Sequence, residues 1–169
     1  MLKRRILPVT PPKTTSETLA FAALSGLRSM AAPALLARAI RRGDLPDPKG
    51  TPYELLGRHS PLLQLLMVGE MVGDKTPFVP SRTSAGPLLG RAASGALVAA
   101  ALRASGGRGG KGSAALLSAV SAVAAAFAGE NLRAQGARRL GVPDLVLALL
   151  EDGIVLYAGT RLLRRAGSR

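Results

Sequence analysis

Long apolar segments alternate with short polar ones along the chain, and the lengths of the apolar segments are those of helices. The first begins after Thr14 and Glu17, which have the spacing of a helix capping box, and it contains Pro33, which predicts a kink. A loop rich in proline and glycine follows, with a short surface helix expected at Tyr53–Gly57. The pattern predicts longer helices at residues 18–40, 61–74, 83–103, 112–136 and 144–164.

The segment from Gly112 to Gly129 contains no charged residue. An uncharged run of about 18 residues or more is typical of a helix that crosses a membrane. A helix of a soluble bundle would instead repeat charges along one side. The absence of Trp counts against a membrane, because Trp and Tyr mark its interfaces. We expect an all-α integral membrane bundle of four to five helices, formed by residues 15–165 and preceded by a flexible basic arm at residues 1–14.

The amino-acid composition limits which binding partners and which kinds of catalytic or metal site the protein can have. The net charge of +13 favours an anionic partner, either lipid headgroups or nucleic acid, and the apolar runs favour the lipid bilayer. The chain has no cysteine and a single histidine, so no metal site or cofactor is predicted. It also has no Ser-His-Asp set and no glycine-rich phosphate loop, which disfavours an enzyme and leaves only an all-carboxylate site open.

Ionisable residues interrupt several of the apolar runs. An isolated charge near the centre of a bilayer costs at least about 2.5–3.5 kcal/mol, so such groups should face inward and form pairs. Two interpretations remain open: ion pairs that fix the register of the helices, or a carboxylate that binds a proton or an ion beside an arginine. The predicted charge cluster, with no residue assigned as catalytic, consists of Arg28, Glu70, Asp74, Lys75, Arg91, Glu151 and Asp152.

Two pairs of glycines are spaced four residues apart, Gly69 with Gly73 and Gly86 with Gly90. This spacing lets another helix approach closely. We therefore predict that these four glycines pack helices together, within one chain or between copies of it.

The two halves of the chain show a weak similarity. Residues 25–29 (SGLRS) resemble 130–134 (ENLRA), and alignment of Pro61 with Pro143 places Glu70 opposite Asp152. An inverted repeat of this kind is common in transporters, whose sites lie near the repeat interface. If all five segments cross the membrane, nine basic residues lie on the side of the N-terminal arm and twelve on the other. That difference is too small to set the orientation.

Four stretches in order, GLRSMAAPALLAR, GEMVGDKTP, AGPLLGRAASGALVAA and LLEDGIVLYAG, resemble a family of small bacterial integral membrane proteins of unknown function. The resemblance spans nearly the whole chain and implies a multi-pass protein of the bacterial cytoplasmic membrane. Gly86-Pro87 stands where typical members have Arg-Pro. The resemblance implies no activity. The positions that it makes characteristic are Arg28, Glu70, Asp74, Lys75, Pro77, Arg91, Glu151 and Asp152.

Three functions compete at this point. The first is a small transporter or channel-like protein that uses Glu70 and Asp152. The second is a non-catalytic scaffold or assembly subunit, present as a homo-oligomer or in a larger membrane complex. The third and least favoured is a soluble basic helical protein that binds nucleic acid, with an affinity that falls steeply as salt rises.

Overall fold

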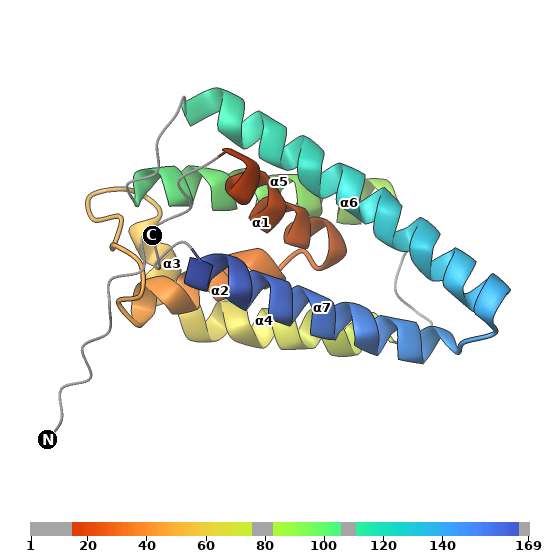
Figure 1. Cartoon of the computed structure of the whole chain (residues 1–169). Coiled ribbons are helices and arrows are strands. Elements are labelled where there is room, and N and C mark those ends of the chain that lie inside the picture. The colour runs from red at the N-terminus through yellow and green to blue at the C-terminus, as the bar shows by residue number, and fades with distance from the viewer. Residues whose placement is uncertain (1–14, 76–82, 106–110, 166–169) are drawn as a thin grey trace, which may run out of the picture.

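The fold is all-α, as the sequence predicts. The computed structural model describes residues 15–75, 83–105 and 111–165, and this part of the chain holds seven helices and no strand (Figure 1). The predicted N-terminal arm and Pro77 lie outside the described residues. The helices are α1 (Thr15–Leu27), α2 (Ala31–Arg41), α3 (Glu54–Arg58), α4 (Ser60–Gly73), α5 (Ala85–Ala104), α6 (Lys111–Leu140) and α7 (Asp144–Arg165).

The last four helices and the short α3 match the predicted segments to within a few residues. The first prediction is wrong, because residues 18–40 form two helices rather than one kinked helix. The break falls at Arg28–Met30, and Pro33 lies in the first turn of α2. Amide groups there have no partner within the helix, so a proline is tolerated without a kink.

The helices α1 and α2 form a hairpin that folds back at the break. A Cβ atom on Gly159 of α7 would lie 2.4 Å from Leu35 Cδ1 and 3.1 Å from Leu24 Cδ1. Residues before and after the break therefore lie at the same level of α7. Figure 1 shows α1 running toward the right and α2 returning toward the left.

The longer helices run along one axis of the molecule in alternating directions (Figure 1). At one end, called here the arginine-rich end, α2, α5 and α7 finish and α4 and α6 begin. At the other end, called the turn end, α6 connects to α7 through residues 141–143. The beginning of α1 lies toward the arginine-rich end, because α1 and α2 share the tip of the hairpin.

Small residues let α1 and α5 approach α6 closely. A Cβ atom on Gly26 would lie 2.0 Å from the Ala122 carbonyl oxygen, and one on Gly95 would lie 2.8 Å from the Ser118 carbonyl oxygen. Larger side chains fill the space between α1, α2, α5 and α7, and those that are almost fully buried include Phe21, Leu36, Val98, Leu102 and Val155.

Among the described residues, no neighbouring helix comes close to the positions that side chains would take at the four glycines predicted to pack helices. A Cβ atom added to Gly69, Gly73, Gly86 or Gly90 would meet nothing within 4 Å among the described residues. Within the described residues, the close approach of helices occurs instead at Gly26, Gly95 and Gly159. Contacts between copies of the chain stay a prediction.

In the described part of the chain, two helices are long and apolar enough to cross a membrane, α5 and the segment Ser113–Leu140 of α6. Only 39% of the apolar window in α5 and 28% of that in α6 is buried, whereas the core helix of a soluble protein is mostly buried. The helix α4 is also apolar but shorter. The sequence predicts a membrane bundle of four or five helices. The length and composition of the observed helices support two of them as membrane spans.

Candidate functional site

The break between α1 and α2 leaves backbone groups without helical partners inside the molecule. Carbonyls at the end of α1 and amides at the start of α2 point away from their own helices, and they need other partners when water is absent. Polar side chains from α4 and α5 supply these partners. The candidate functional site is built around this break.

Arg91 of α5 binds the end of α1. Its Nη1 donates to the carbonyl oxygens of Gly26 at 2.8 Å and Leu27 at 2.9 Å. The neighbouring Ser94 donates its hydroxyl to the Ser29 carbonyl oxygen. A cation here also balances the partial negative charge that a helix carries at its C-terminus.

Glu70 of α4 binds the start of α2. Its carboxylate accepts hydrogen bonds from the backbone amides of Ser29 at 2.7 Å and Met30 at 2.9 Å, and from the Ser29 hydroxyl at 3.0 Å. This places an anion at the positive end of the helix dipole. Arg91 Nη2 lies 3.7 Å from Glu70 Oε1, so the two side chains that cap the break also pair with each other.

Arg28 lies at the tip of the hairpin and is fully buried. Its guanidinium contacts two carboxylates, Asp152 through Nε at 2.6 Å and Asp74 through Nη1 at 2.5 Å. Lys75 Nζ binds the other oxygen of Asp152 at 2.6 Å and donates to the Met71 carbonyl oxygen. These contacts join α4 and α7 to the break.

Arg133 of α6 continues the network toward the turn end. It shares Asp74 Oδ2 with Arg28, at 3.0 Å, and forms a double hydrogen bond with Asp144 at the start of α7. Its Nη1 also lies 3.8 Å from Glu151. The side chain of Asp144 is 65% exposed, so the network reaches the molecular surface there.

The inner part of this network balances its charges. It is formed by the acidic residues Glu70, Asp74, Glu151 and Asp152 and the basic residues Arg28, Lys75, Arg91 and Arg133. Charges removed from water are tolerated only when they are paired and hydrogen-bonded. The arrangement can therefore hold the break in place through ion pairs between its carboxylates and basic side chains.

All seven residues predicted as a charge cluster come together. Sequence reasoning did not place Ser29, Ser94, Arg133 or Asp144 in this cluster. A signal for Arg133 was present, because the similarity between residues 25–29 and 130–134 aligns it with Arg28. No comparable signal marked the two serines, whose role depends on the break.

The site has no evident metal centre. The described part of the chain contains no group of three or more His, Asp or Glu residues that could hold a metal ion. Arginine and lysine groups already engage the carboxylates, as described above.

The comparisons with known proteins identify no relative, since no family model, curated protein or solved structure matches the chain. The resemblance to small bacterial membrane proteins stays a prediction.

Proposed function

We propose that the protein is a multi-pass integral membrane protein in which α1 and α2 form a re-entrant hairpin. The observation that carries this proposal is the distribution of side chains: charges are buried inside the bundle and large apolar side chains cover its outside. Only helices and closed barrels can cross a membrane, and irregular backbone at that depth has to be buried in protein. The break meets this requirement through the caps supplied by Glu70 and Arg91.

The exposed apolar side chains lie on several helices. Leu65 of α4 is 68% exposed, Leu116 and Leu132 of α6 are 68% and 70% exposed, and Ile154 of α7 is 60% exposed. Soluble monomers rarely expose large contiguous apolar surface. Arg28 and Arg91, in contrast, are only 0% and 5% exposed. This inside-out pattern is what a lipid solvent favours.

Fractionation of expressing cells tests the membrane proposal. We expect the protein to stay in the membrane pellet after a carbonate wash at high pH, because its outer faces remain in lipid. Release into the supernatant would overturn the proposal.

The hairpin also changes the expected orientation. The twelve-to-nine count assumed that residues 18–40 cross the membrane, whereas α1 and α2 return to the same end. Among the described residues the turn end has only Lys75, Arg133, Arg138 and Arg139. The arginine-rich end has Arg38, Arg41, Arg42, Lys49, Arg58, Arg103, Arg161 and Arg164. By the positive-inside rule, we propose that the arginine-rich end faces the cytoplasm.

An inverted repeat is supported only in part. The helices that carry Glu70 and Asp152, α4 and α7, run in opposite directions, as such a repeat requires (Figure 1). Arg28, however, lies at a break and Arg133 lies within the uninterrupted α6. The two halves therefore differ in how their first helix is built.

Within the membrane protein, we propose that the network at the break forms part of a path for a small ion or solute. Discontinuous helices whose ends meet inside the membrane form the binding sites of many transporters. Arg28 Nη2 is buried and has no hydrogen-bond partner among the described residues. A water molecule or a small ligand is one way to satisfy a buried donor of this kind. Among the basic residues that share a carboxylate with Arg28, Lys75 has the more exposed side chain, at 20% against 15% for Arg133.

Flux into proteoliposomes tests this path. With H⁺, K⁺ and Cl⁻ as probes, we expect the flux of at least one ion into protein-containing vesicles to exceed its leak into empty vesicles. Asp152→Asn should change that flux by about tenfold or more, because intramembrane carboxylates mark ion pathways. The matched control is Asp47→Asn, which changes an exposed carboxylate outside the network. Equal flux in wild-type and empty vesicles for every probe would contradict the proposal.

A second candidate function is an assembly subunit. It is favoured by the position of Gly69 on α4, where an added Cβ atom would meet nothing within 4 Å among the described residues. A glycine at such an open position lets a helix from another chain approach closely. Crosslinking in native membranes, with Gly69→Leu as the disrupting variant, would detect it. A protein that stays monomeric and binds no partner would exclude this candidate.

A further inference from the structure

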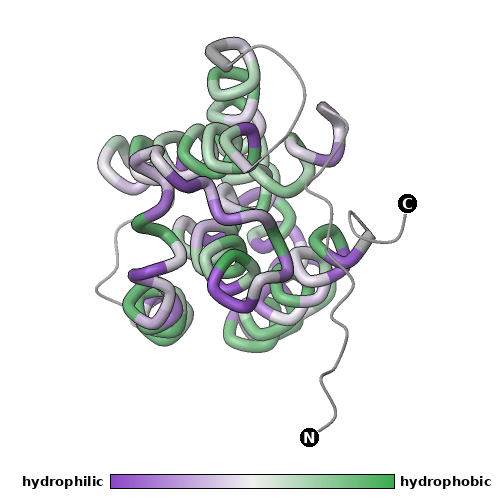
Figure 2. Tube along the Cα trace, turned by 90° about the vertical axis from the view of Figure 1, so that its left-hand side faces the viewer, coloured by the Kyte–Doolittle hydropathy of each residue, from purple (hydrophilic) through white to green (hydrophobic). Residues whose placement is uncertain are grey.

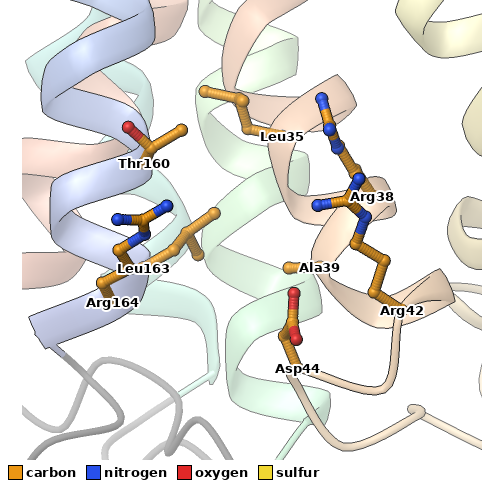
Figure 3. Close-up of a pocket in the computed structure, with 8 residues that line it drawn as sticks. All are labelled: Leu35, Arg38, Ala39, Arg42, Asp44, Thr160, Leu163 and Arg164. Carbon is orange, nitrogen blue, oxygen red and sulfur yellow. The ribbon is translucent and has the colours of Figure 1, made fainter. Parts of the chain in front are cut away.

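A pocket of about 390 Å³ lies between the ends of α2 and α7, at the arginine-rich end and away from the charge network. Figure 3 shows Arg38 and Arg42 on the α2 side, Arg164 on the α7 side, and Asp44 between them. The buried side chains of Leu35 and Leu163 complete the wall. This space is called here the arginine pocket.

The three arginines of the pocket are exposed, and none of their guanidinium groups forms an ion pair or hydrogen bond with the described residues. The three positive charges therefore face one volume with a single carboxylate, Asp44, among them. Like charges close together repel each other, and an anion between them removes that repulsion. Guanidinium groups match the oxygen atoms of phosphate in geometry and bind them in pairs.

An apolar strip of α7 leads into the pocket. Leu150, Ile154 and Tyr157 are 57%, 60% and 66% exposed, and they follow one another at helical spacing. The same spacing continues to Thr160 and Arg164, which line the pocket. The outer side of α7 is thus apolar along its length and cationic where it ends. Figure 2 looks at this end, where hydrophilic segments lie in front of largely hydrophobic helices.

We propose that the arginine pocket binds the phosphate group of an anionic lipid, whose acyl chains lie along the apolar strip of α7. Arg38, Arg42 and Arg164 would hold the phosphate oxygens, and Asp44 would accept hydrogen bonds from hydroxyl groups of the headgroup. This inference rests on the proposed membrane location. Soluble molecules also carry phosphate esters. The experiment below therefore distinguishes a lipid headgroup from a soluble phosphate ester.

The test measures binding of individual lipids to the purified, detergent-solubilised protein by native mass spectrometry. The probes are dioleoyl phosphatidylglycerol and dioleoyl phosphatidylcholine, which share their acyl chains, with soluble glycerol 3-phosphate as the headgroup alone. We expect phosphatidylglycerol to bind about tenfold or more tightly than phosphatidylcholine, since each paired guanidinium–phosphate contact strengthens binding. Binding of glycerol 3-phosphate as tightly as phosphatidylglycerol would overturn the lipid assignment.

Matched variants locate the binding. Replacement of Arg38, Arg42 and Arg164 by Gln should abolish the preference for phosphatidylglycerol. The control replaces Arg41, Lys49 and Arg58 by Gln, which removes the same charge from the same end outside the pocket. The single variant Arg164→Gln serves if the triple variant does not fold, and it should weaken binding at least threefold. Equal losses in the pocket and control variants would overturn the proposal, because they would indicate diffuse attraction to the surface.

The carbonate wash separates failure of this inference from failure of the membrane proposal. A protein that stays in the membrane without a lipid preference contradicts the arginine pocket alone. A protein released from the membrane contradicts both.

Discussion

At the scale of single residues, Glu70 shows why charges occur inside apolar helices of this chain. It accepts hydrogen bonds from two backbone amides at the start of α2 and lies beside Arg91, which caps the end of α1. A broken helix leaves groups that neither lipid nor apolar side chains can satisfy. Glu70 and Arg91 therefore stabilise the two helix ends at the break, and this role does not depend on the proposed path for an ion or solute.

Glu70→Ala is expected to lower the free energy of unfolding by roughly 2 kcal/mol, since it removes a helix cap whose groups are partly buried. Glu70→Gln should lose less, because its amide oxygen still accepts one hydrogen bond. Unfolding of the purified protein in detergent measures both. The control is Glu54→Ala, which removes an exposed contact to the Gly50 amide. Equal losses at Glu70 and Glu54 would contradict the capping role.

Arg28 and Asp152 should be energetically coupled. Arg28 is fully buried against the carboxylate, and removal of one partner of a buried pair typically costs about 3–5 kcal/mol. The double variant Arg28→Met with Asp152→Leu should therefore lose less than the sum of the single losses, by about 1 kcal/mol or more. A double-mutant cycle on unfolding free energies measures this coupling. Simple additivity would show that the contact has little energetic weight.

The charge cluster could be predicted from the sequence because isolated charges in apolar runs have few ways to be satisfied. That reasoning required Arg28, Glu70 and Asp152 to face inward and meet ions of opposite sign, and they do. It could not assign partners. Glu70 binds backbone amides that become available only when α1 ends at Leu27, and the sequence was interpreted as one continuous helix there.

At the scale of elements, the hairpin is the feature that the apolar pattern concealed. The run from 18 to 40 has no polar interruption longer than a few residues, so its periodicity indicates one helix. The local signal was Pro33, which suits the first turn of a helix as well as a kink. Tertiary contacts decide between these outcomes, because Glu70 and Arg91 stabilise two helix ends that would otherwise be unsatisfied.

Packing of the hairpin on α6 should depend on Gly26. A Cβ atom at this position would lie 2.0 Å from the Ala122 carbonyl oxygen, and backbone cannot move aside as a flexible side chain can. Gly26→Ala should therefore cost about 1–3 kcal/mol, as overpacking does. Gly69→Ala is the control, since its Cβ would meet nothing and alanine favours a helix by up to about 1 kcal/mol. Unfolding free energies compare the two, and equal effects would contradict close packing of α1 on α6.

At the scale of the whole molecule, the proposed membrane location gives the hairpin a further consequence, because it sets how the chain would cross the bilayer. A single helix over 18–40 would place residues 16 and 49 on opposite sides. The observed hairpin returns the chain to the arginine-rich end, so both residues belong on the same side. Since α6 is 30 residues long, its end near Arg139 lies at the turn end, on the other side.

Cysteine labelling in sealed inverted membrane vesicles tests this threading, and the natural chain has no cysteine to interfere. The single variants Ser16→Cys, Lys49→Cys and Arg139→Cys replace residues that are all exposed. A membrane-impermeant maleimide applied to the outer, originally cytoplasmic, face should label the first two and not the third. Permeabilised vesicles, in which all three should react, provide the control. Labelling of Lys49→Cys without Ser16→Cys would show that the first segment crosses the membrane. Labelling of Arg139→Cys alone would keep the hairpin and reverse the orientation, because residues 16 and 49 would still lie together on the opposite side.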